Sequence, residues 1–419
     1  MNRFFIIALV LVSAYSSCIF SQADKNGGSL YSIFGLGELS YSASSRTDGM
    51  GIMGLALYGN YSNSFNPASW TRIQSTLFST KFNFERLLSS DGTNSAKRVY
   101  GNFESFILSI PLNRGNGWIL NLGLDNYSLV NYDTKFTSSI GGEQYTQTYS
   151  GNGGLNRLNA GFSYIIFNDF SIGVQYNFIF GNTARTFNID FNNPQIFDTK
   201  NASEDKVYGF YFNTGLIYHG FTKLFRSRKL ENLTLGVFFS TPAQLNSSIT
   251  GRYNRTINQT DSVALSEGKI DLPWSIGAGI SNTFNDRLLV AADFYMQNWD
   301  NYKYYGKHPD EIKNSMRLGA GIEFTDSKNP EDSYFKRMSY RLGGFYLADY
   351  LRINNEAINT MGFSAGLTLP VGQYTGVDLI MQYYTRGKTS NGLIKDDVFR
   401  FGATVRIGEL WFLKQSDDF

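Results

Sequence analysis

Three glycines, Gly49, Gly51 and Gly54, form a G-x-G-x-x-G spacing, which in some proteins holds a nucleotide. In a dinucleotide-binding domain this spacing follows a buried strand, opens a long helix, and precedes an acidic residue by about twenty positions. Here the polar run 44–48 precedes the glycines, and Trp70 stands near the position of the acid. The context therefore favours glycines that permit tight backbone turns over a phosphate-binding site.

Residues for metal or nucleophilic chemistry are scarce, since the chain has 2 His and 1 Cys. His219 is placed at the end of a predicted strand and His308 in a polar loop, with no Cys/His cluster and no Ser/His/Asp spacing around either. An outer-membrane phospholipase would need one of these histidines beside a serine. The sequence predicts no catalytic residue, no metal site and no cofactor, and a protein that is not an enzyme.

From residue 75 onward, apolar and polar residues alternate with a period of two. In the run 315–324 (SMRLGAGIEF), Met316 and Leu318 share one face, while Arg317 and Glu323 share the other with glycines. The runs 207–218 and 399–408 repeat this pattern, which is typical of two-faced strands. Because bulky residues dominate the apolar face and the runs exceed the usual ~5–6 residues, we predict strands that cross a membrane.

Fourteen such segments can be placed between residues 75 and 412, and an even number suits an antiparallel barrel. The predicted fold class is therefore all-β, a transmembrane antiparallel β-barrel of about 14 strands, with its apolar face toward lipid. The stretches 133–153, 187–204 and 245–269 are rich in Asn, Ser and Thr, and we expect long polar loops there. A net charge of +2 and 17% charged residues give no basic field, so we expect no nucleic-acid partner.

The chain begins with Arg3 and an unbroken apolar run, 4–12, followed by small polar residues. This pattern predicts a signal peptide over 1–21 and export to the outer membrane of a Gram-negative bacterium. Cys18 lacks the context of a lipidated cysteine, which disfavours a lipoprotein. Residues 22–74 are dense in Gly and Ser and do not alternate, so we expect a hatch that plugs the lumen, before a barrel over 75–412 and a tail over 413–419.

Short motifs along nearly the whole chain resemble the long-chain fatty-acid transporter family of Gram-negative outer membranes (FadL-like), which includes toluene and xylene uptake porins. The matching residues are Gly49-Met50-Gly51 with Gly54, Asn66-Pro67-Ala68, and the runs 272–279 (LPWSIGAG) and 288–299 (LLVAADFYMQNW). The resemblance implies a hatch-plugged fourteen-stranded barrel that takes up hydrophobic molecules. The type IX secretion shuttle barrels resemble the same family and offer a rival function.

Two groups of residues are candidates for function. The hatch or gate group is Gly49, Gly51, Gly54, Asn66, Pro67 and Ala68. Charges on the predicted lumen face are Asp125, Arg157, Asp271, Asp293, Arg317, Glu323, Arg341, Asp378, Arg400 and Arg406, and apolar residues there include Tyr211, Tyr295 and Trp299. The alternation favours ion pairs that join strands and hatch; the functional alternative is that Arg157 or Arg317 meets a carboxylate headgroup beside an apolar path.

These patterns predict an outer-membrane channel for passive uptake of fatty-acid-like or aromatic molecules, gated by the hatch. The alternative is a barrel partner or shuttle in protein secretion or surface attachment. The expected partners are outer-membrane lipid, a hydrophobic small-molecule ligand, the barrel-assembly machinery during insertion and, in the alternative, a secretion-system protein.

Overall fold

The computed structural model describes residues 28–42, 44–167, 169–193, 195–227, 230–256 and 259–411, without the side chains of 253–256 and 259–265. The predicted signal peptide with Cys18, the first residues of the predicted hatch and the predicted tail lie outside the described residues.

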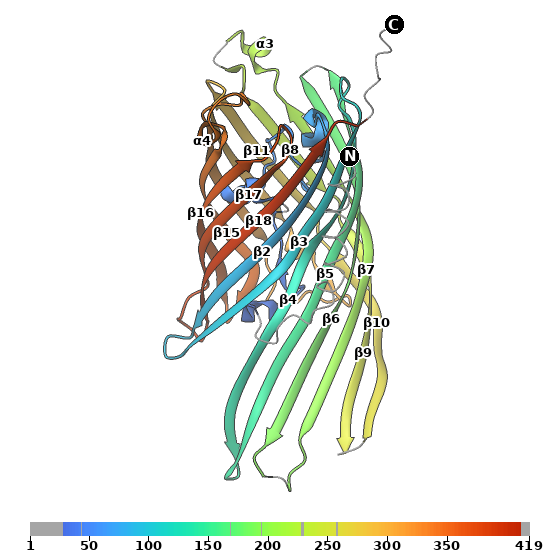
Figure 1. Ribbon diagram of the computed structural model, residues 1–419. Helices are drawn as coiled ribbons and strands as arrows, with labels where there is room; N and C mark the ends of the chain where they lie inside the picture. Colours follow the sequence, from blue (N-terminus) through green and yellow to red (C-terminus); the bar gives the residue numbers. More distant parts are fainter. Residues whose placement is uncertain are drawn as a thin grey trace, which may run out of the picture.

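The chain forms a closed antiparallel β-barrel of 14 strands, as predicted (Figure 1). The barrel strands are β2 (Thr76–Ser90), β3 (Ser95–Asn113), β4 (Trp118–Ile140), β5 (Glu143–Phe167), β6 (Phe170–Phe191), β7 (Thr199–Tyr218), β8 (Thr234–Ser240) continued by β9 (Ala243–Thr256), β10 (Gln259–Leu272) continued by β11 (Ser275–Phe284), β12 (Leu288–Gln297), β14 (Ser315–Thr325), β15 (Ser339–Ile353), β16 (Glu356–Pro370), β17 (Gly376–Arg386) and β18 (Lys395–Glu409). Strand β18 pairs with β2 from Lys395 opposite Ser90 to Glu409 opposite Thr76, which closes the cylinder.

Two of the fourteen strands are interrupted at prolines. Pro242 separates β8 from β9, and Pro273 separates β10 from β11, because proline cannot donate to the ladder. The remaining elements are the short strands β1 (Glu38–Leu39) and β13 (Lys303–Tyr304), the helices α2 (Ser45–Gly49), α3 (Phe221–Phe225) and α4 (Tyr334–Arg337), and the 3-10 helices η1 (Leu30–Ile33), η2 (Pro67–Arg72) and η4 (Trp299–Asn301). Within the described ranges, no helix is long and apolar enough to span a bilayer.

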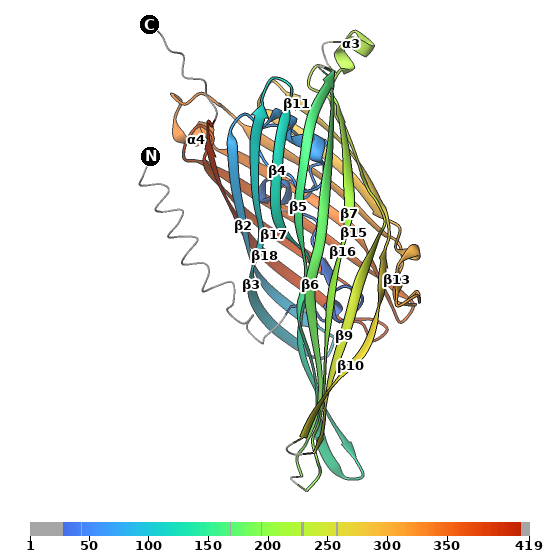
Figure 2. The same ribbon diagram turned by 90° about the vertical axis from the view of Figure 1, so that its right-hand side faces the viewer.

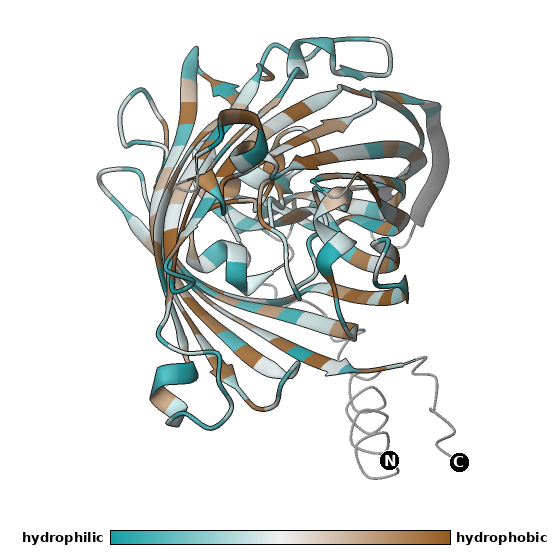
Figure 3. Cartoon of the chain, turned by 90° about the horizontal axis from the view of Figure 1, so that it is seen from above, coloured by the Kyte–Doolittle hydropathy of each residue, from teal (hydrophilic) through white to brown (hydrophobic). Residues whose placement is uncertain are grey.

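An apolar belt surrounds the outside of the barrel. Phe162 on β5 and Phe210 on β7 are 53% and 55% exposed, whereas the inward Gln175 and Asn213 are fully buried. Hydrophobic and hydrophilic residues alternate along the strands when the barrel is seen from above (Figure 3). The lipid-facing side predicted from the period of two is therefore the observed outer side.

The strands are not equally long. Strands β4 to β7, with β9 and β10, continue far beyond the rest of the barrel at the end opposite helix α3 (Figures 1 and 2). The loops predicted over 133–153, 187–204 and 245–269 were wrong, since most of these residues lie in paired strands. Thr, Ile, Phe and Tyr are interspersed among the polar residues there, and these residue types favour strands even where the average is polar.

Residues 28–75, called the hatch from here on, lie inside the barrel (Figure 3). Met50, Ile52, Leu55 and Trp70 of the hatch are 0% exposed. A segment this rich in glycine cannot enclose a core of its own, and it obtains burial from the surrounding wall.

Candidate functional site

The wall that faces the hatch is built from glycines. A Cβ added at Gly343 or Gly321 would come within 2.0 or 2.2 Å of the Met50 carbonyl oxygen, and one at Gly319 within 2.3 Å of the Gly51 oxygen. No real Cβ tolerates these distances, so the hatch backbone lies directly on the wall backbone. The glycine-rich face of β14 and β15 is therefore a seat for the hatch.

The G-x-G-x-x-G run forms a tight turn in this seat. Gly49 ends α2, and Gly51 and Gly54 have φ of 69° and 79°, a region that favours glycine. The Asp293 carboxylate on β12 accepts the N–H of Gly54 at 2.5 Å and that of Leu55 at 3.1 Å. Backbone amides that would face a phosphate in a nucleotide site are thus bound by the chain's own carboxylate.

The Asn66-Pro67-Ala68 motif starts η2 and fixes it to another part of the wall. The Asn66 side chain accepts the Ala68 N–H at 3.0 Å and donates to the Leu55 carbonyl at 2.6 Å. Two directly paired glycines, Gly173 and Gly215, leave room for the motif, since a Cβ at Gly215 would lie 1.9 Å from Asn66 Oδ1. The motif is a cap with proline at the first helical position, a pre-organised helix start.

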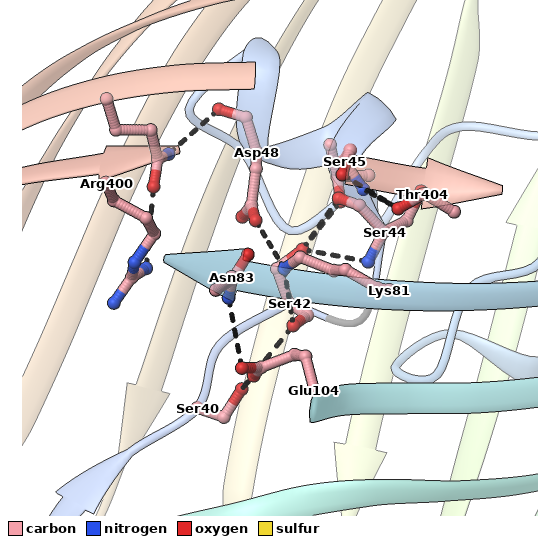
Figure 4. Close-up of polar contacts among 12 residues, drawn as sticks. Ser40, Ser42, Ser44, Ser45, Asp48, Lys81, Asn83, Glu104, Arg400 and Thr404 are labelled. Atoms are coloured by element: carbon pink, nitrogen blue, oxygen red, sulfur yellow. Dashed lines mark hydrogen bonds and ion pairs between the residues drawn. The ribbon is translucent and has the colours of Figure 1, made fainter. Parts of the chain in front are cut away.

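Charged hatch residues pair with charged wall residues from three different strands. Glu38 pairs with Arg386 at 2.5 Å, Arg46 with Glu323 at 2.7 Å, and Asp48 with Lys81 at 2.5 Å. Figure 4 shows the Lys81 ammonium between the Asp48 carboxylate and the Ser42 carbonyl. Burial alone would raise the pKa of Asp48, but the nearby Lys81 and Arg400 bring it below its ordinary value.

The predicted candidates Glu323 and Arg341 belong to one buried ion network. Glu323 accepts from Arg46 of the hatch and from Arg341 at 2.6 Å, and Arg341 also contacts Asp378 at 3.3 Å. Arg406 reaches the same Asp378 carboxylate at 2.7 Å. The network joins the hatch to β14, β15, β17 and β18, the structural role that the alternation favours.

Three other predicted candidates meet around one small cavity of about 40 Å³. Arg157 pairs with Asp125 and donates to the Tyr211 hydroxyl at 3.2 Å. Tyr295 lines the same cavity, and Tyr41 of the hatch forms one of its sides. Aromatic and polar side chains line the cavity, and its one cation already has a carboxylate partner.

Arg317 lies beside a second cavity of about 90 Å³, which Tyr41, Arg386 and Arg400 also line together with several carboxylates. Its Nη2 donates to the Gly51 carbonyl at 3.2 Å, and its guanidinium stands 5.0 Å from the centre of the Phe345 ring. In the part of the chain that the structure describes, its buried Nη1 has no hydrogen-bond partner. Arg317 is therefore the lumenal cation best able to accept an added anion.

The positions of two other candidate residues, Trp299 and Asp271, differ from the prediction. Trp299 is in η4, not at a cavity, and it stacks on Tyr350 with ring centroids 4.5 Å apart. Asp271, expected on the lumen face, lies between the buried Ile270 and Leu272 and accepts from Gln244 at 2.9 Å on the outer side. Its place is set by the long hairpin of β9 and β10, which the sequence did not predict.

Sequence reasoning missed the hatch partners Glu38, Arg46 and Asp48, and the wall residue Lys81. Lys81 shares a face with Ser79 and Asn83 on β2, so the period of two places it in the lumen. Its partner Asp48 lies in a segment without periodicity, so the sequence does not indicate that the two residues pair.

Comparisons with known proteins agree with this architecture. The family model described as BamG matches residues 1–417. Among solved structures, the CymD monoaromatic hydrocarbon channel is 13% identical, covering 88% of this chain and 98% of that one, with a TM-score of 0.57. A Pseudomonas aeruginosa FadL homologue is 13% identical over 88% and 99% (TM-score 0.56), and the Ralstonia pickettii toluene transporter TbuX is 12% identical over 85% and 100% (TM-score 0.52). Comparison with curated proteins gives no match. The FadL-like fold predicted from the motifs is confirmed.

Proposed function

The chain belongs to the BamG family, and from this premise we propose that it is an outer-membrane channel for the passive uptake of hydrophobic small molecules, gated by its hatch. The similar structures include a hydrocarbon channel and a toluene transporter, which supports this class of cargo. We place the end with the long strands at the cell exterior, because outer-membrane barrels extend farther beyond the membrane on the outer side than on the periplasmic side.

The observation that carries the proposal is the pair of cavities on either side of Tyr41. The 40 Å³ cavity is lined by aromatic and polar side chains with Arg157, and the 90 Å³ cavity by aromatic side chains, several carboxylates and Arg317, Arg386 and Arg400. Both cavities are small, about 90 and 40 Å³, and Leu39, Ser40 and Tyr41 of the hatch line both of them. Uptake therefore requires residues 38–42 to move, which merges the cavities into a larger path.

A gap in the wall gives this path a lateral exit. The pairing of β3 with β4 ends at Ser105 opposite Asp125, although both strands continue. The short strand β1 of the hatch fills the opening by pairing Glu38 with Leu129 of β4. The movement of residues 38–42 that merges the cavities would also break the pairing of β1 with β4. The 90 Å³ cavity would then open toward the outside of the barrel.

Arg317 gives the path a polar anchor. A carboxylate that entered beside Phe345 would meet the unpartnered Nη1 in a water-poor site, where a charge-assisted hydrogen bond is strong. Monoaromatic hydrocarbons would use only the aromatic lining. Arg317→Met is then expected to weaken uptake of oleate and to leave that of toluene unchanged.

A disulfide lock tests the hatch. The Ser45 and Thr404 hydroxyl oxygens lie 2.7 Å apart between hatch and β18, so Ser45→Cys with Thr404→Cys can tether them. Thr325→Cys with Ser339→Cys is the matched control, because it joins neighbouring strands at a similar 2.7 Å without touching the hatch. Oxidation of the first pair should abolish oleate uptake and bilayer conductance, and reductant should restore both. Normal transport by the locked barrel would refute a mobile hatch.

A second candidate function is a partner role in barrel assembly or protein secretion. The family name points to a barrel-assembly machinery, and this observation favours it. Depletion of this protein would then lower the amounts of other outer-membrane proteins. The disulfide-locked and the reduced variant would restore these amounts equally well. Uptake defects without an assembly defect would favour the channel instead.

A further inference from the structure

The connection between β7 and β8 is both basic and apolar. Residues 221–230, called the rim segment from here on, read FTKLFRSRKL and contain four cations, four large apolar residues and no acid. The cations are Lys223, Arg226, Arg228 and Lys229. A basic and apolar run of this kind is typical of segments that lie on a membrane surface. The hatch contacts and the two cavities described above do not involve it.

Helix α3 begins the rim segment and is fixed to the end of the barrel. Lys223 pairs with Asp169 in the turn between β5 and β6. The N–H of His219, just before the helix, donates to the Asp169 carbonyl at 3.0 Å. Phe221 is buried, and its ring meets that of Tyr218, the last residue of β7, with centroids 4.9 Å apart. The helix therefore has a defined place beside the ends of β5, β6 and β7.

The other two apolar side chains of α3 are exposed at the edge of the apolar belt. Leu224 and Phe225 are 63% and 62% exposed. Toward the same end, β5 exposes Tyr164, Ile166 and its last residue, Phe167. The belt therefore reaches the end of the strand beside which α3 is attached. A bilayer that covers the belt to this point would also cover Leu224 and Phe225.

Exposed cations flank these apolar side chains. Lys223 precedes Leu224, and Arg226 follows Phe225 and ends the helix with a φ of 50°. The Lys223 side chain is 68% exposed despite its pair with Asp169, and Arg226 is also exposed. Long basic side chains at a bilayer surface keep their stems in the apolar layer and their charges among the headgroups. Phosphate is the headgroup anion that a guanidinium binds best.

A second short helix at the same end has a similar surface. Helix α4 has no buried residue, and its Tyr334 and Phe335 are exposed beside Lys336 and Arg337. The Arg337 guanidinium lies 5.7 Å from the centre of the Tyr334 ring. Helix α3 follows β7 and α4 precedes β15, so they lie on different sides of the barrel end opposite the long strands (Figures 1 and 2). Two separate points at this end thus carry the aromatic and basic residues of a membrane interface.

We propose that the rim segment binds the phosphate headgroups of anionic phospholipids in the periplasmic leaflet, with Leu224 and Phe225 among the acyl chains. Charge complementarity favours an anionic lipid, because four cations within ten residues attract a negatively charged surface. A lipid without net charge would offer only the apolar contacts. The choice of leaflet rests on the orientation given above, with the long strands at the cell exterior. The proposal does not depend on the passage of any cargo.

A fluorescent label tests whether α3 lies in lipid. Cys18, in the predicted signal peptide, is the one cysteine of the chain, so an introduced cysteine can be labelled alone. Phe225→Cys, Phe363→Cys and Phe197→Cys replace side chains of similar exposure, at 62%, 69% and 66%. Phe363 lies on the lipid-facing side of β16 and Phe197 in the loop between β6 and β7, so they mark lipid and water. In phospholipid nanodiscs, lipid-borne nitroxide should quench the label at 225 and 363 but not at 197.

Native mass spectrometry of lipids retained from nanodiscs of phosphatidylethanolamine and phosphatidylglycerol tests the headgroup. The wild-type chain should retain phosphatidylglycerol. A variant without the rim cations should retain it at least about tenfold less, because each Lys or Arg near an anionic surface adds to the attraction. This variant combines Lys223→Gln, Arg226→Gln, Arg228→Gln and Lys229→Gln. The matched control, which should bind as the wild type does, removes four exposed cations at the other end of the barrel, by Lys97→Gln, Lys135→Gln, Lys200→Gln and Arg252→Gln.

Three outcomes would overturn the proposal. They are a label at position 225 that behaves like the one at 197, equal retention of phosphatidylglycerol by the rim variant and its control, and retention of lipopolysaccharide in place of phosphatidylglycerol when both are offered. The last outcome would place α3 at the outer leaflet. Heat-modifiable migration in gels confirms that each variant barrel is folded. Neither measurement involves transport, so failure of the channel proposal leaves both tests intact.

Discussion

The inward faces of the belt and of the extended sheet, which is the part of β4 to β7, β9 and β10 that continues beyond the belt, belong to the same strands, yet they are chemically different. In the belt, β6 presents Gly173, Gln175 and Asn177 to the lumen, where the hatch backbone lies against the glycine. Farther along, the same face of β6 presents Phe187, Ile189 and Phe191, where no segment of the described chain covers it. On β6, therefore, the inward glycine lies against a peptide backbone, whereas the inward aromatic residues lie beyond the hatch.

The largest expected effect comes from a side chain placed in the glycine seat. Gly343→Leu directs a Cβ to within 2.0 Å of the Met50 carbonyl, and backbone cannot yield as a flexible side chain can. We expect the hatch to be expelled, with raised conductance and rapid proteolysis within residues 28–75. Gly344→Leu is the control, because its Cβ would point outward and meet nothing closer than 3.3 Å. Equal protection of the hatch from proteolysis in both variants would contradict the view that the inward glycines of the wall hold the hatch in place.

A smaller loss is expected from the ion network behind the hatch. Asp378→Asn removes the carboxylate that pairs with Arg406 and one of the two that pair with the buried Arg341, and breaking a buried pair typically costs about 3–5 kcal/mol. The loss of stability is measured as a shift in the midpoint of urea unfolding in detergent. Asp397→Asn removes an exposed pair with Lys395 and should change stability by less than about 1 kcal/mol. Similar midpoints for the two variants would mean that the network is solvated.

The smallest effect should come from the inward aromatic residues of the extended sheet. Phe136→Ser with Tyr149→Ser removes exposed rings that support no core, so the unfolding free energy should change by no more than about 0.5 kcal/mol for each. The same unfolding measurement checks it. A loss as large as that of Asp378→Asn would show that the aromatic rows hold the sheet together, and the comparison between the two regions would fail.

The sequence predicted those features that repeat every two residues. The fourteen strands, the lipid-facing side and the lumenal positions of Arg157, Arg317 and Glu323 follow from local alternation. The extended sheet was missed because its Thr-rich strands have the average polarity of loops. The ion pairs were missed because Glu323 meets Arg46 across 277 positions, and no local pattern encodes a contact with an irregular segment.

The hatch contacts also impose an order of assembly. Its ion pairs connect residue 46 with 323 and residue 38 with 386, near opposite ends of the chain. The hatch is made before β14 and β17, so these two ion pairs can form only after those strands are in place. Seating of the hatch against them is an intramolecular docking event whose entropic cost grows only slowly with the length of the intervening chain.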